Sequence, residues 1–309
     1  MGSPGHPSLP PGVVVLERGW LSSNNVVLRG SDDAAVVDTG YWTHSGQTLA
    51  LVEGAALGLP VHTLVNTHLH SDHCGGNAAL QARFPDMETW IPPGQAEAVR
   101  RWDPVALTYE PTGQHCPPFT IDGVLVPGTA LRLGEREWEV HAAPGHDPHS
   151  VILFEPVSRT LISADALWQN GFGVVFPELE GVHAFDEVAA TLDVIERLEP
   201  KLVIPGHGPV FTDVGLALER ARSRLAAYVA DPARHAAHAG KVLLKFKLLE
   251  LQRVEFQQML GWAQETRYLK TVHRKWFAQT ATRQWIALLV EDLVRSGAAT
   301  RDGDLVLNA

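Results

Sequence analysis

The chain lacks the features that mark several large classes of protein. It has only two cysteines in 309 residues, Cys74 and Cys116, and they do not form a CxxC pair, which argues against a disulfide framework and a cysteine-rich metal site. No apolar run approaches the roughly 20 residues needed to cross a bilayer. The first residues have neither a basic segment nor an apolar segment typical of a secretion leader. We therefore expect a globular protein of the cytoplasm, with reduced thiols and no membrane partner.

Several catalytic signatures are missing as well. The sequence contains no Walker phosphate loop, no GxGxxG turn after a strand, no HExxH pair and no GxSxG elbow. Basic residues are also scarce, because 25 Lys and Arg face 35 Asp and Glu for a net charge of −10. The acidic excess lies in residues 1–212, since residues 213–309 carry 15 basic and 10 acidic side chains. An acidic body repels nucleic acid and attracts cations.

The first two thirds of the chain alternate short apolar runs with turns and helical patterns. Strands are predicted at residues 13–16, 26–28, 34–38, 63–66, 138–143, 151–154, 160–163 and 202–204. Apolar residues recur at steps of three and four from Ala184 to Leu198, which predicts an amphipathic helix there. Early strands joined by turns and later strands joined by helices indicate a mixed α/β fold with helices on the sheet faces.

Residues after Thr212 have a different composition. The stretches 213–230 and 241–270 are rich in Leu, Ala and Arg, which predicts long helices, with a break near Asp231-Pro232 because proline disfavours helix before it. A further helix is predicted over 285–296, followed by a two-strand turn at 301–304. Helix followed by hairpin is typical of a winged-helix-like cap. We therefore expect two domains, a catalytic one at 1–212 and a helical one at 213–309.

Residues of metal-ligand type cluster in one segment, Asn66 to Gly76, directly after a predicted strand. It holds three imidazoles and one carboxylate within six residues: His68, His70, Asp72 and His73. Side chains two apart at an extended strand end point the same way, so His68 and His70 can bind one metal ion. Asp72 and His73 then face a neighbouring point. This run can hold two ions side by side.

Three more residues of metal-ligand type follow predicted strands: His146, Asp165 and His207. In layered α/β folds, sites lie beyond the carboxyl ends of strands, where loops converge. Ligation by nitrogen and oxygen alone suits zinc best, while iron or manganese at one position also fits. The predicted cofactor is therefore two divalent metal ions. Cys74, beside His73, is interpreted as a buried packing residue.

With these motifs the sequence resembles the metallo-β-lactamase superfamily over residues 12–212. The motifs are Asp38 in Val-Asp-Thr-Gly, the His-Leu-His-Ser-Asp-His run at 68–73, His146, Asp165 and His207. The resemblance implies a four-layer αββα sandwich with its site at one edge between two sheets. It places one ion on His68, His70 and His146, and the other on Asp72, His73 and His207. It also implies that Asp165 bridges the ions and that Asp38 supports the ligands, which makes Asp72 and Asp165 the expected catalytic carboxylates.

The combination of Asp72-His73 with Asp165 resembles the dinuclear hydrolases, such as glyoxalase II, lactonases and the RNase Z group, rather than the true β-lactamases. In such a site two cations lower the pKa of a bridging water, so that hydroxide attacks a carbonyl or phosphoryl group polarised by one ion. We therefore expect a hydrolase of a small-molecule thioester, ester or lactone. One alternative is a metal-dependent nuclease or phosphodiesterase that holds RNA with its basic C-terminal part. Another is a metal-binding sensor without activity.

The charge count favours the small molecule over nucleic acid, because a nuclease should carry a continuous basic track with stacking aromatics. The loop after Asp165 supplies Trp168, Asn170 and Phe172 as candidate substrate contacts, and Tyr41 after Asp38 is a fourth. Packing of that loop under the helical region, or of Tyr41 into the sheet edge, remains an alternative interpretation. Asp147 and His149 are candidates for orienting ligand imidazoles. The sequence leaves open whether the protein forms a homodimer.

Overall fold

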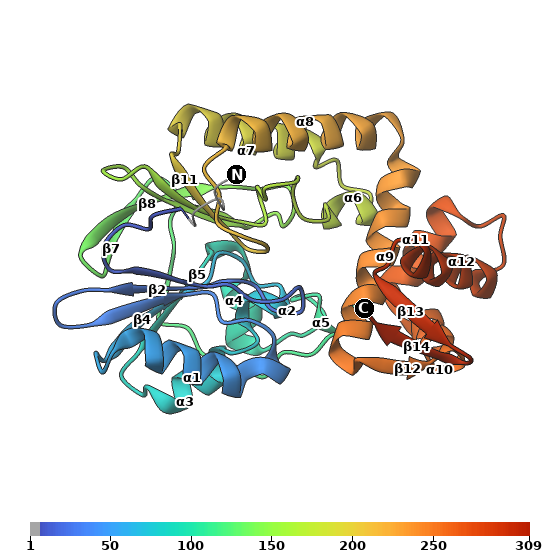
Figure 1. The fold of residues 1–309 in the computed structure, drawn as a ribbon, viewed down its shortest axis with the longest axis horizontal. Coiled ribbons are helices and arrows are strands. Elements are labelled where there is room, and N and C mark those ends of the chain that lie inside the picture. The colour runs from blue at the N-terminus through green and yellow to red at the C-terminus, as the bar shows by residue number, and fades with distance from the viewer. Residues whose placement is uncertain (1–6) are drawn as a thin grey trace, which may run out of the picture.

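A computed structural model describes residues 7–309, and two stacked β-sheets form its centre (Figure 1). The first sheet has six strands in chain order: β1 (Val13–Leu16), β2 (Asn25–Arg29), β3 (Ala34–Val37), β4 (Val61–Val65), β5 (Glu88–Ile91) and β6 (Gly123–Val124). The strands β1 to β3 pair antiparallel, whereas β3 to β6 pair parallel. The carboxyl ends of β3, β4 and β5 therefore meet at one edge of this sheet.

The second sheet has five strands in the reverse of chain order: β11 (Leu202–Pro205), β10 (Thr160–Ala164), β9 (Val151–Glu155), β8 (Arg136–Ala142) and β7 (Ala130–Leu133). Its pairs are antiparallel except β10 with β11, which run parallel. The carboxyl ends of β10 and β11 consequently lie side by side.

The strands read as continuous apolar runs because both of their faces are buried. Val26 and Leu28 of β2 belong to the core between the sheets, while Val27 belongs to the core on the outer face of the first sheet. In the second sheet, Leu153 of β9 points between the sheets and Ile152 points outward. This alternation follows from the period of two along a strand.

Helices cover both outer faces and complete the predicted four-layer αββα arrangement (Figure 1). The helices α1 (Ser45–Ala56) and α3 (Asn77–Arg83) lie on the first sheet, and α7 (Phe185–Leu198) and α8 (Val214–Ala230) on the second. The amphipathic pattern over 184–198 thus forms the predicted helix. The remaining short helices are η1 (Trp42–His44), α2 (Ser71–Cys74), η2 (Pro93–Gln95), α4 (Ala96–Arg101), α5 (Tyr109–Thr112) and α6 (Phe176–Glu180).

The chain turns away from the sandwich after α8. The buried side chains of α8, among them Leu218 and Leu225, share one core cluster with α7 and β11. The next helix, α9 (Pro232–Leu251), begins with proline at its first position and with the Asp231 side chain accepting the backbone N–H of Arg234. The predicted break at Asp231-Pro232 is therefore present, and in Figure 1 α9 runs along one end of the sandwich.

The expectation of one long helix over 241–270 is wrong. The helix α9 ends at Leu251, and Gln252 adopts a positive φ of 64°. Residues Arg253–Glu255 then form strand β12, followed by α10 (Phe256–Glu265) and α11 (Arg267–Trp276). The reason is tertiary, because β12 pairs with β14 (Leu305–Asn308), which lies far along the chain.

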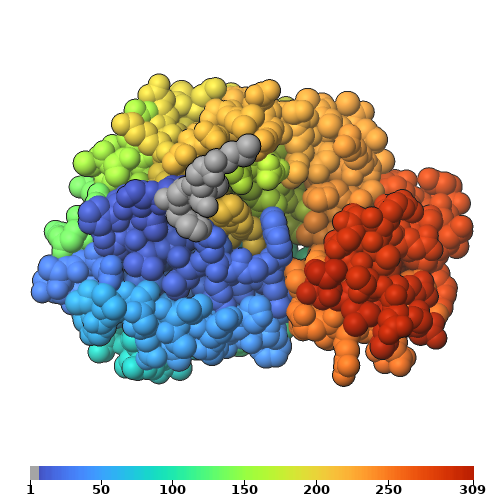
Figure 2. All heavy atoms as spheres, in the orientation of Figure 1, coloured from blue at the N-terminus to red at the C-terminus, as the bar shows by residue number. Residues whose placement is uncertain are grey.

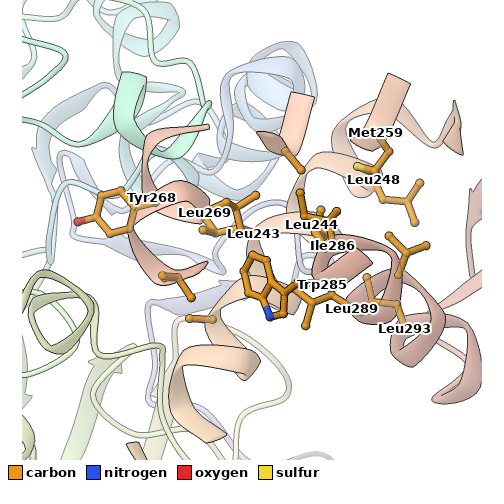
Figure 3. Close-up of a cluster of buried hydrophobic side chains, with 14 of the residues drawn as sticks. Leu243, Leu244, Leu248, Met259, Tyr268, Leu269, Trp285, Ile286, Leu289 and Leu293 are labelled. Carbon is orange, nitrogen blue, oxygen red and sulfur yellow. The ribbon is translucent and has the colours of Figure 1, made fainter. Parts of the chain in front are cut away.

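The C-terminal part is built as a helix followed by a hairpin, as predicted. Helix α12 (Thr282–Arg295) precedes β13 (Ala299–Asp302) and β14, and the small sheet has the order β12, β14, β13. A separate core joins α9 to α12 through residues such as Leu243, Leu244, Trp285, Ile286 and Leu289 (Figure 3). Figure 2 shows this part, in orange and red, against one end of the molecule. Among the described residues, no helix combines the length and apolarity that membrane crossing requires.

Candidate metal centre

The ligand-type residues converge at the edge where the strands end. Each follows a strand directly or lies in the loop between two strands: Asp38 after β3, His68 after β4, His146 between β8 and β9, Asp165 after β10, and His207 after β11. Asp72 and His73 lie on α2, which starts one residue after His70. The strands of the two sheets therefore position side chains from five separate parts of the chain at the same edge of the sandwich.

Three imidazoles form the first ligand cluster. The His70 Nδ1 atom lies 3.1 Å from His68 Nε2 and 2.8 Å from His146 Nε2. His146 donates its Nδ1 proton to the Val174 carbonyl at 2.6 Å, which leaves a lone pair on Nε2. Burial, together with the neighbouring imidazoles, holds the pKa of His68 well below its usual range and lowers the pKa of His146 to about 4. Neutral rings whose lone pairs face one another repel, so this cluster fits a cation.

Asp72, His73 and His207 form the second cluster. The Asp72 Oδ2 atom lies 3.1 Å from His207 Nε2 and 3.9 Å from His73 Nε2. His73 donates its Nδ1 proton to Asp38 at 2.8 Å, and its buried Nε2 has no hydrogen-bond partner within the described part of the chain. Burial alone would lower the pKa of His73, but the carboxylates of Asp165, Asp38 and Asp72 raise it well above its usual range. The position therefore favours positive charge, which a metal ion supplies.

Asp165 stands between the two clusters. Its Oδ2 lies 3.4 Å from His146 Nε2, and its Oδ1 lies 3.5 Å from His73 Nε2. Burial raises its pKa, but His207 and His73 outweigh burial and hold the pKa well below the usual range. The backbone of Gly206 passes so close that a Cβ atom there would lie 2.2 Å from Asp165 Oδ1. An ionised carboxylate with one oxygen toward each cluster has the position of a bridging ligand.

Asp38 aligns ligands without belonging to either cluster. It adopts φ of 57°, a left-handed conformation that Asp tolerates better than most residues. Its Oδ1 accepts the backbone N–H of Thr67 at 2.9 Å, and its Oδ2 accepts the Thr67 hydroxyl at 2.7 Å as well as the His73 ring. The Thr67 oxygen, 3.2 Å from His68 Nδ1, is then free to accept the His68 proton. One carboxylate thus sets the tautomers of two ligands.

A cavity of about 530 Å³ opens above the clusters. Its floor includes His70, Asp72, His146, Asp165 and His207, and Trp168 and Asn170 line its side. The Trp168 indole N–H donates to Asp165 Oδ1 at 3.1 Å. These two candidate substrate residues therefore line the cavity that contains the ligand clusters.

The other two candidate substrate residues lie elsewhere. Phe172 is buried in the core of the second sheet and its outer helices, with its ring edge-on to Tyr228 at 6.3 Å. Tyr41 is fully buried, packs edge-on to Phe246 and donates its hydroxyl to Glu250 at 3.1 Å. Neither lines the cavity. Their aromatic surface is used for packing, which corrects the expectation that they contact substrate.

The two residues proposed to orient imidazoles also differ from each other. Asp147 is buried with Oδ2 at 3.8 Å from His70 Nε2, so it faces the far side of that ligand. The His149 ring instead packs against Gly94, where an added Cβ would lie 2.1 Å from the His149 Nδ1 atom.

Further residues complete the cavity wall, and one of them, Phe176, belongs to the loop after Asp165 that the sequence predicts as a wall. Trp20 stacks on His207 with ring centroids 5.3 Å apart, and Phe176 lies edge-on to His70 at 5.0 Å. The far wall comes from α9 through Val242, Leu243 and Phe246. Nothing local in the sequence indicates Trp20 or α9, because only tertiary packing brings them to the centre. The glycine directly before His207 is a local signal, since Gly206 leaves room for the Asp165 carboxylate.

Comparisons with known proteins agree with this geometry. The family model of the metallo-beta-lactamase superfamily matches residues 18–207. Type A flavoprotein fprA of Rhodobacter capsulatus is 26% identical over 214 residues, which is 64% of this chain and 47% of that protein. Hydroxyacylglutathione hydrolase of Thermosynechococcus vestitus is 29% identical over 126 residues, or 41% of this chain and 42% of that protein. The chain thus spans slightly less than half the length of these curated relatives.

Solved structures show the same fold. The metallo-beta-lactamase family protein TTHA1429 from Thermus thermophilus aligns with a TM-score of 0.58 and 20% identity, covering 98% of this chain and all of that one. TTHA1623, solved in a di-iron-bound form, aligns with a TM-score of 0.51 and 25% identity, covering 68% of this chain and 98% of that one. With its αββα sandwich, its converging ligands and a family match over residues 18–207, the chain belongs to the metallo-β-lactamase superfamily.

Proposed function

We propose that this protein is a hydrolase that uses two divalent cations, zinc above all, to cleave a small-molecule thioester, ester or lactone. The observation that carries the proposal is the pair of three-residue clusters on either side of Asp165, at the floor of a cavity with largely apolar walls. The similarity to hydroxyacylglutathione hydrolase, a protein named for hydrolysis of a glutathione derivative, supports the thioester class.

The side chains of the centre have distinct tasks in this reaction. Two bound divalent cations supply Lewis-acid polarisation of a carbonyl oxygen and lower the pKa of water toward neutrality. Val174 and Asp38 hold His146 and His73 with their Nε2 lone pairs toward the centre. Asp165 stays ionised, and the Trp168 indole fixes the orientation of its carboxylate. Fixed groups of this kind need little reorganisation when charge develops in the transition state.

The cavity walls favour an apolar acyl group. Phe176, Val242 and Phe246 present carbon surface to the cavity that the ligand clusters also line. Such walls exclude water from the bond under attack, which strengthens electrostatic interactions inside the site. No protein nucleophile is required, and Cys74, the cysteine beside His73, directs its thiol away from the centre toward Tyr109 and Cys116.

The test combines metal content with turnover. We expect His68→Ala and Asp165→Ala to lose most bound metal and nearly all hydrolysis, while Cys74→Ala keeps both. Elemental analysis should accompany assays with a thioester, a lactone, a phosphodiester and a β-lactam, with a chelator as control. Wild-type turnover in metal-free His68→Ala would overturn the proposal. Cleavage of the phosphodiester alone would instead favour the nuclease, and metal binding without turnover would favour a sensor.

A further inference from the structure

A second cavity of about 830 Å³ lies between α8 and α9, beside the metal cavity. The two cavities share Asn170, Arg224 and His238 in their linings. Four basic side chains surround the second cavity: Arg220, Arg224, Arg234 and Lys241. Glu219 is the one acidic residue in its lining. We call this cavity the basic groove.

The arginines of the basic groove are not neutralised by protein carboxylates. Within the described residues, Arg220, Arg224 and Arg234 have no carboxylate oxygen within 4.0 Å, and Lys241 lies 3.7 Å from Asp292. By contrast, Arg222 on the same helix pairs with Asp193 at 2.7 Å and with Glu196 at 2.9 Å. The helix α8 therefore presents its paired arginine toward α7 and its unpaired arginines toward the groove.

The basic groove connects directly to the metal centre through one tight turn. The Arg224 guanidinium lies against Gly171, where an added Cβ would be 2.5 Å from Nη1. Gly171 accepts the backbone N–H of Trp168 at 2.6 Å, and the Trp168 indole donates to Asp165. Arg220 holds the same turn by donating to Asn170 Oδ1 at 3.0 Å. A ligand in the groove would thus lie next to the loop that begins at the bridging carboxylate.

The local charge identifies the chemistry of the ligand. Burial, together with Arg224 and Lys241, lowers the pKa of His238 to about 4, so this shared residue is neutral at pH 7. Guanidinium groups bind carboxylates and phosphates through paired N–H donors. Three arginines without a carboxylate partner, in a lining that also holds Lys241, paired with Asp292, and one glutamate, complement a group with several negative charges better than a single carboxylate. Phosphate groups have that property.

We propose that the basic groove binds the phosphate-bearing leaving group of the substrate whose bond is cleaved in the metal cavity. This assignment rests on the proposed hydrolase function. In a thioester, the C–S bond breaks, water gives its hydroxyl to the acyl carbon, and the remaining proton goes to the sulfur. The apolar acyl group lies against Val242 and Phe246, and the phosphorylated thiol extends past the turn at 168–171 toward Arg224 and Arg234.

The first experiment measures binding without catalysis. Metal-depleted protein is titrated calorimetrically with adenosine 3′,5′-bisphosphate. We expect Arg224→Gln and Arg234→Gln each to weaken binding by about tenfold or more, because a hydrogen bond to a charged group is worth at least that factor. Arg222→Gln is the matched control and should bind as the wild type does. Absence of binding, or equal binding by Arg224→Gln and Arg222→Gln, would overturn the assignment of the groove.

The second experiment measures selectivity of the metal-loaded enzyme. The butyryl thioester of coenzyme A, which carries phosphates, is compared with the butyryl thioester of neutral N-acetylcysteamine. We expect the ratio of the two kcat/KM values to fall about tenfold in Arg224→Gln and to stay constant in Arg222→Gln. An unchanged ratio in Arg224→Gln would refute the role of the groove.

The outcomes of the two experiments separate the proposed function from the assignment of the basic groove. If neither thioester is hydrolysed, the thioester form of the proposed function is wrong and the leaving-group assignment is wrong with it, whatever the titration shows. If both thioesters are hydrolysed at equal rates and the bisphosphate does not bind, the proposed hydrolase function is supported. The proposal that the basic groove binds the leaving group is then wrong. A single-stranded RNA 12-mer serves as a third probe. Its cleavage, with loss of binding in Arg224→Gln, would replace the small-molecule ligand with RNA.

Discussion

Asp38 orients His73 directly and His68 through Thr67, although it belongs to neither ligand cluster. Its carboxylate accepts three hydrogen bonds, from the backbone and hydroxyl of Thr67 and from the ring of His73. These bonds force the His73 proton onto Nδ1 and leave the Nε2 lone pair directed at Asp72 and Asp165. In the proposed metal centre, the tautomer of His73 is therefore set by a residue outside both ligand clusters.

Asp38→Asn tests this role with almost no change of shape. Asparagine also tolerates the left-handed backbone at this position. If its amide nitrogen faces His73, the His73 proton must move to Nε2, which then cannot bind metal. We expect metal affinity about 10- to 100-fold weaker, as for other partners of metal ligands, measured by competition with a chromophoric chelator. Asp32→Asn, at the exposed turn before β3, is the control, and unchanged affinity in Asp38→Asn would contradict the argument.

Much of the centre is predictable from sequence at the scale of single residues. The spacing of His68, His70 and His73 puts three imidazoles in one turn, and the structure brings the other two ring centroids within 4.7 Å of that of His68. Their partners are less predictable, because Val174 acts through a backbone carbonyl and Thr67 through an ordinary hydroxyl. A backbone carbonyl leaves no trace in residue identity. The pattern therefore shows candidate ligands but not what orients them.

At the scale of elements, buried strands are more predictable than edges and breaks. The central strands β3, β4, β10 and β11 are largely apolar and buried, so their sequences stand out. The strands β5, β6 and β7 escape sequence analysis because they are short or partly exposed, and β6 has only two residues. Pairing with a neighbouring strand, rather than composition, makes such segments extended. The end of α9 at Leu251 has the same origin in the pairing of β12 with β14.

One buried histidine joins α9 to the loop that follows Asp165. The backbone N–H of Val175 donates to His235 Nε2 at 3.1 Å, so this ring nitrogen must be unprotonated. Phe185 and Tyr228 surround the ring, with centroids at 5.3 and 4.9 Å. Burial, with a smaller contribution from His238, lowers the pKa of His235 to about 4. The contact between α9 and the loop therefore depends on a neutral imidazole.

This contact predicts acid sensitivity of the fold. The unfolded chain has an ordinary histidine pKa and takes up a proton near pH 6.5, whereas the folded chain resists it down to about pH 4. Stability is therefore complete above pH 6.5 and decreases as the pH falls toward 4, by at most about 3 kcal/mol from this residue. Urea unfolding at several pH values measures the effect. In His235→Gln, whose amide oxygen can still accept from Val175, the slope between about pH 6.5 and 4.5 should be smaller, and an equal slope would refute the assignment.

At the scale of the whole molecule, the C-terminal part completes a site that the sandwich begins. The sandwich supplies the ligands, while α9 supplies one wall of the metal cavity and part of the basic groove. The charge count of residues 213–309 indicates a modest basic excess, but not that unpaired arginines gather on one side of α8 and α9. That arrangement depends on the packing of α8 on α7, which pairs Arg222 and leaves Arg224 facing the groove.

Acyl-chain selectivity should consequently be adjustable from α9 without disturbing the metal. Val242 is half-buried, lines the cavity and belongs to no ligand cluster. In Val242→Trp the larger ring fills space beside Phe246, so we expect kcat/KM for an octanoyl thioester to fall about tenfold more than for an acetyl thioester. Leu288→Trp, an exposed aliphatic position on α12, controls for the added ring. Metal content should be equal in both variants. An unchanged octanoyl-to-acetyl ratio would mean that α9 does not border the bound acyl group, and selectivity would then have to come from the sandwich loops alone.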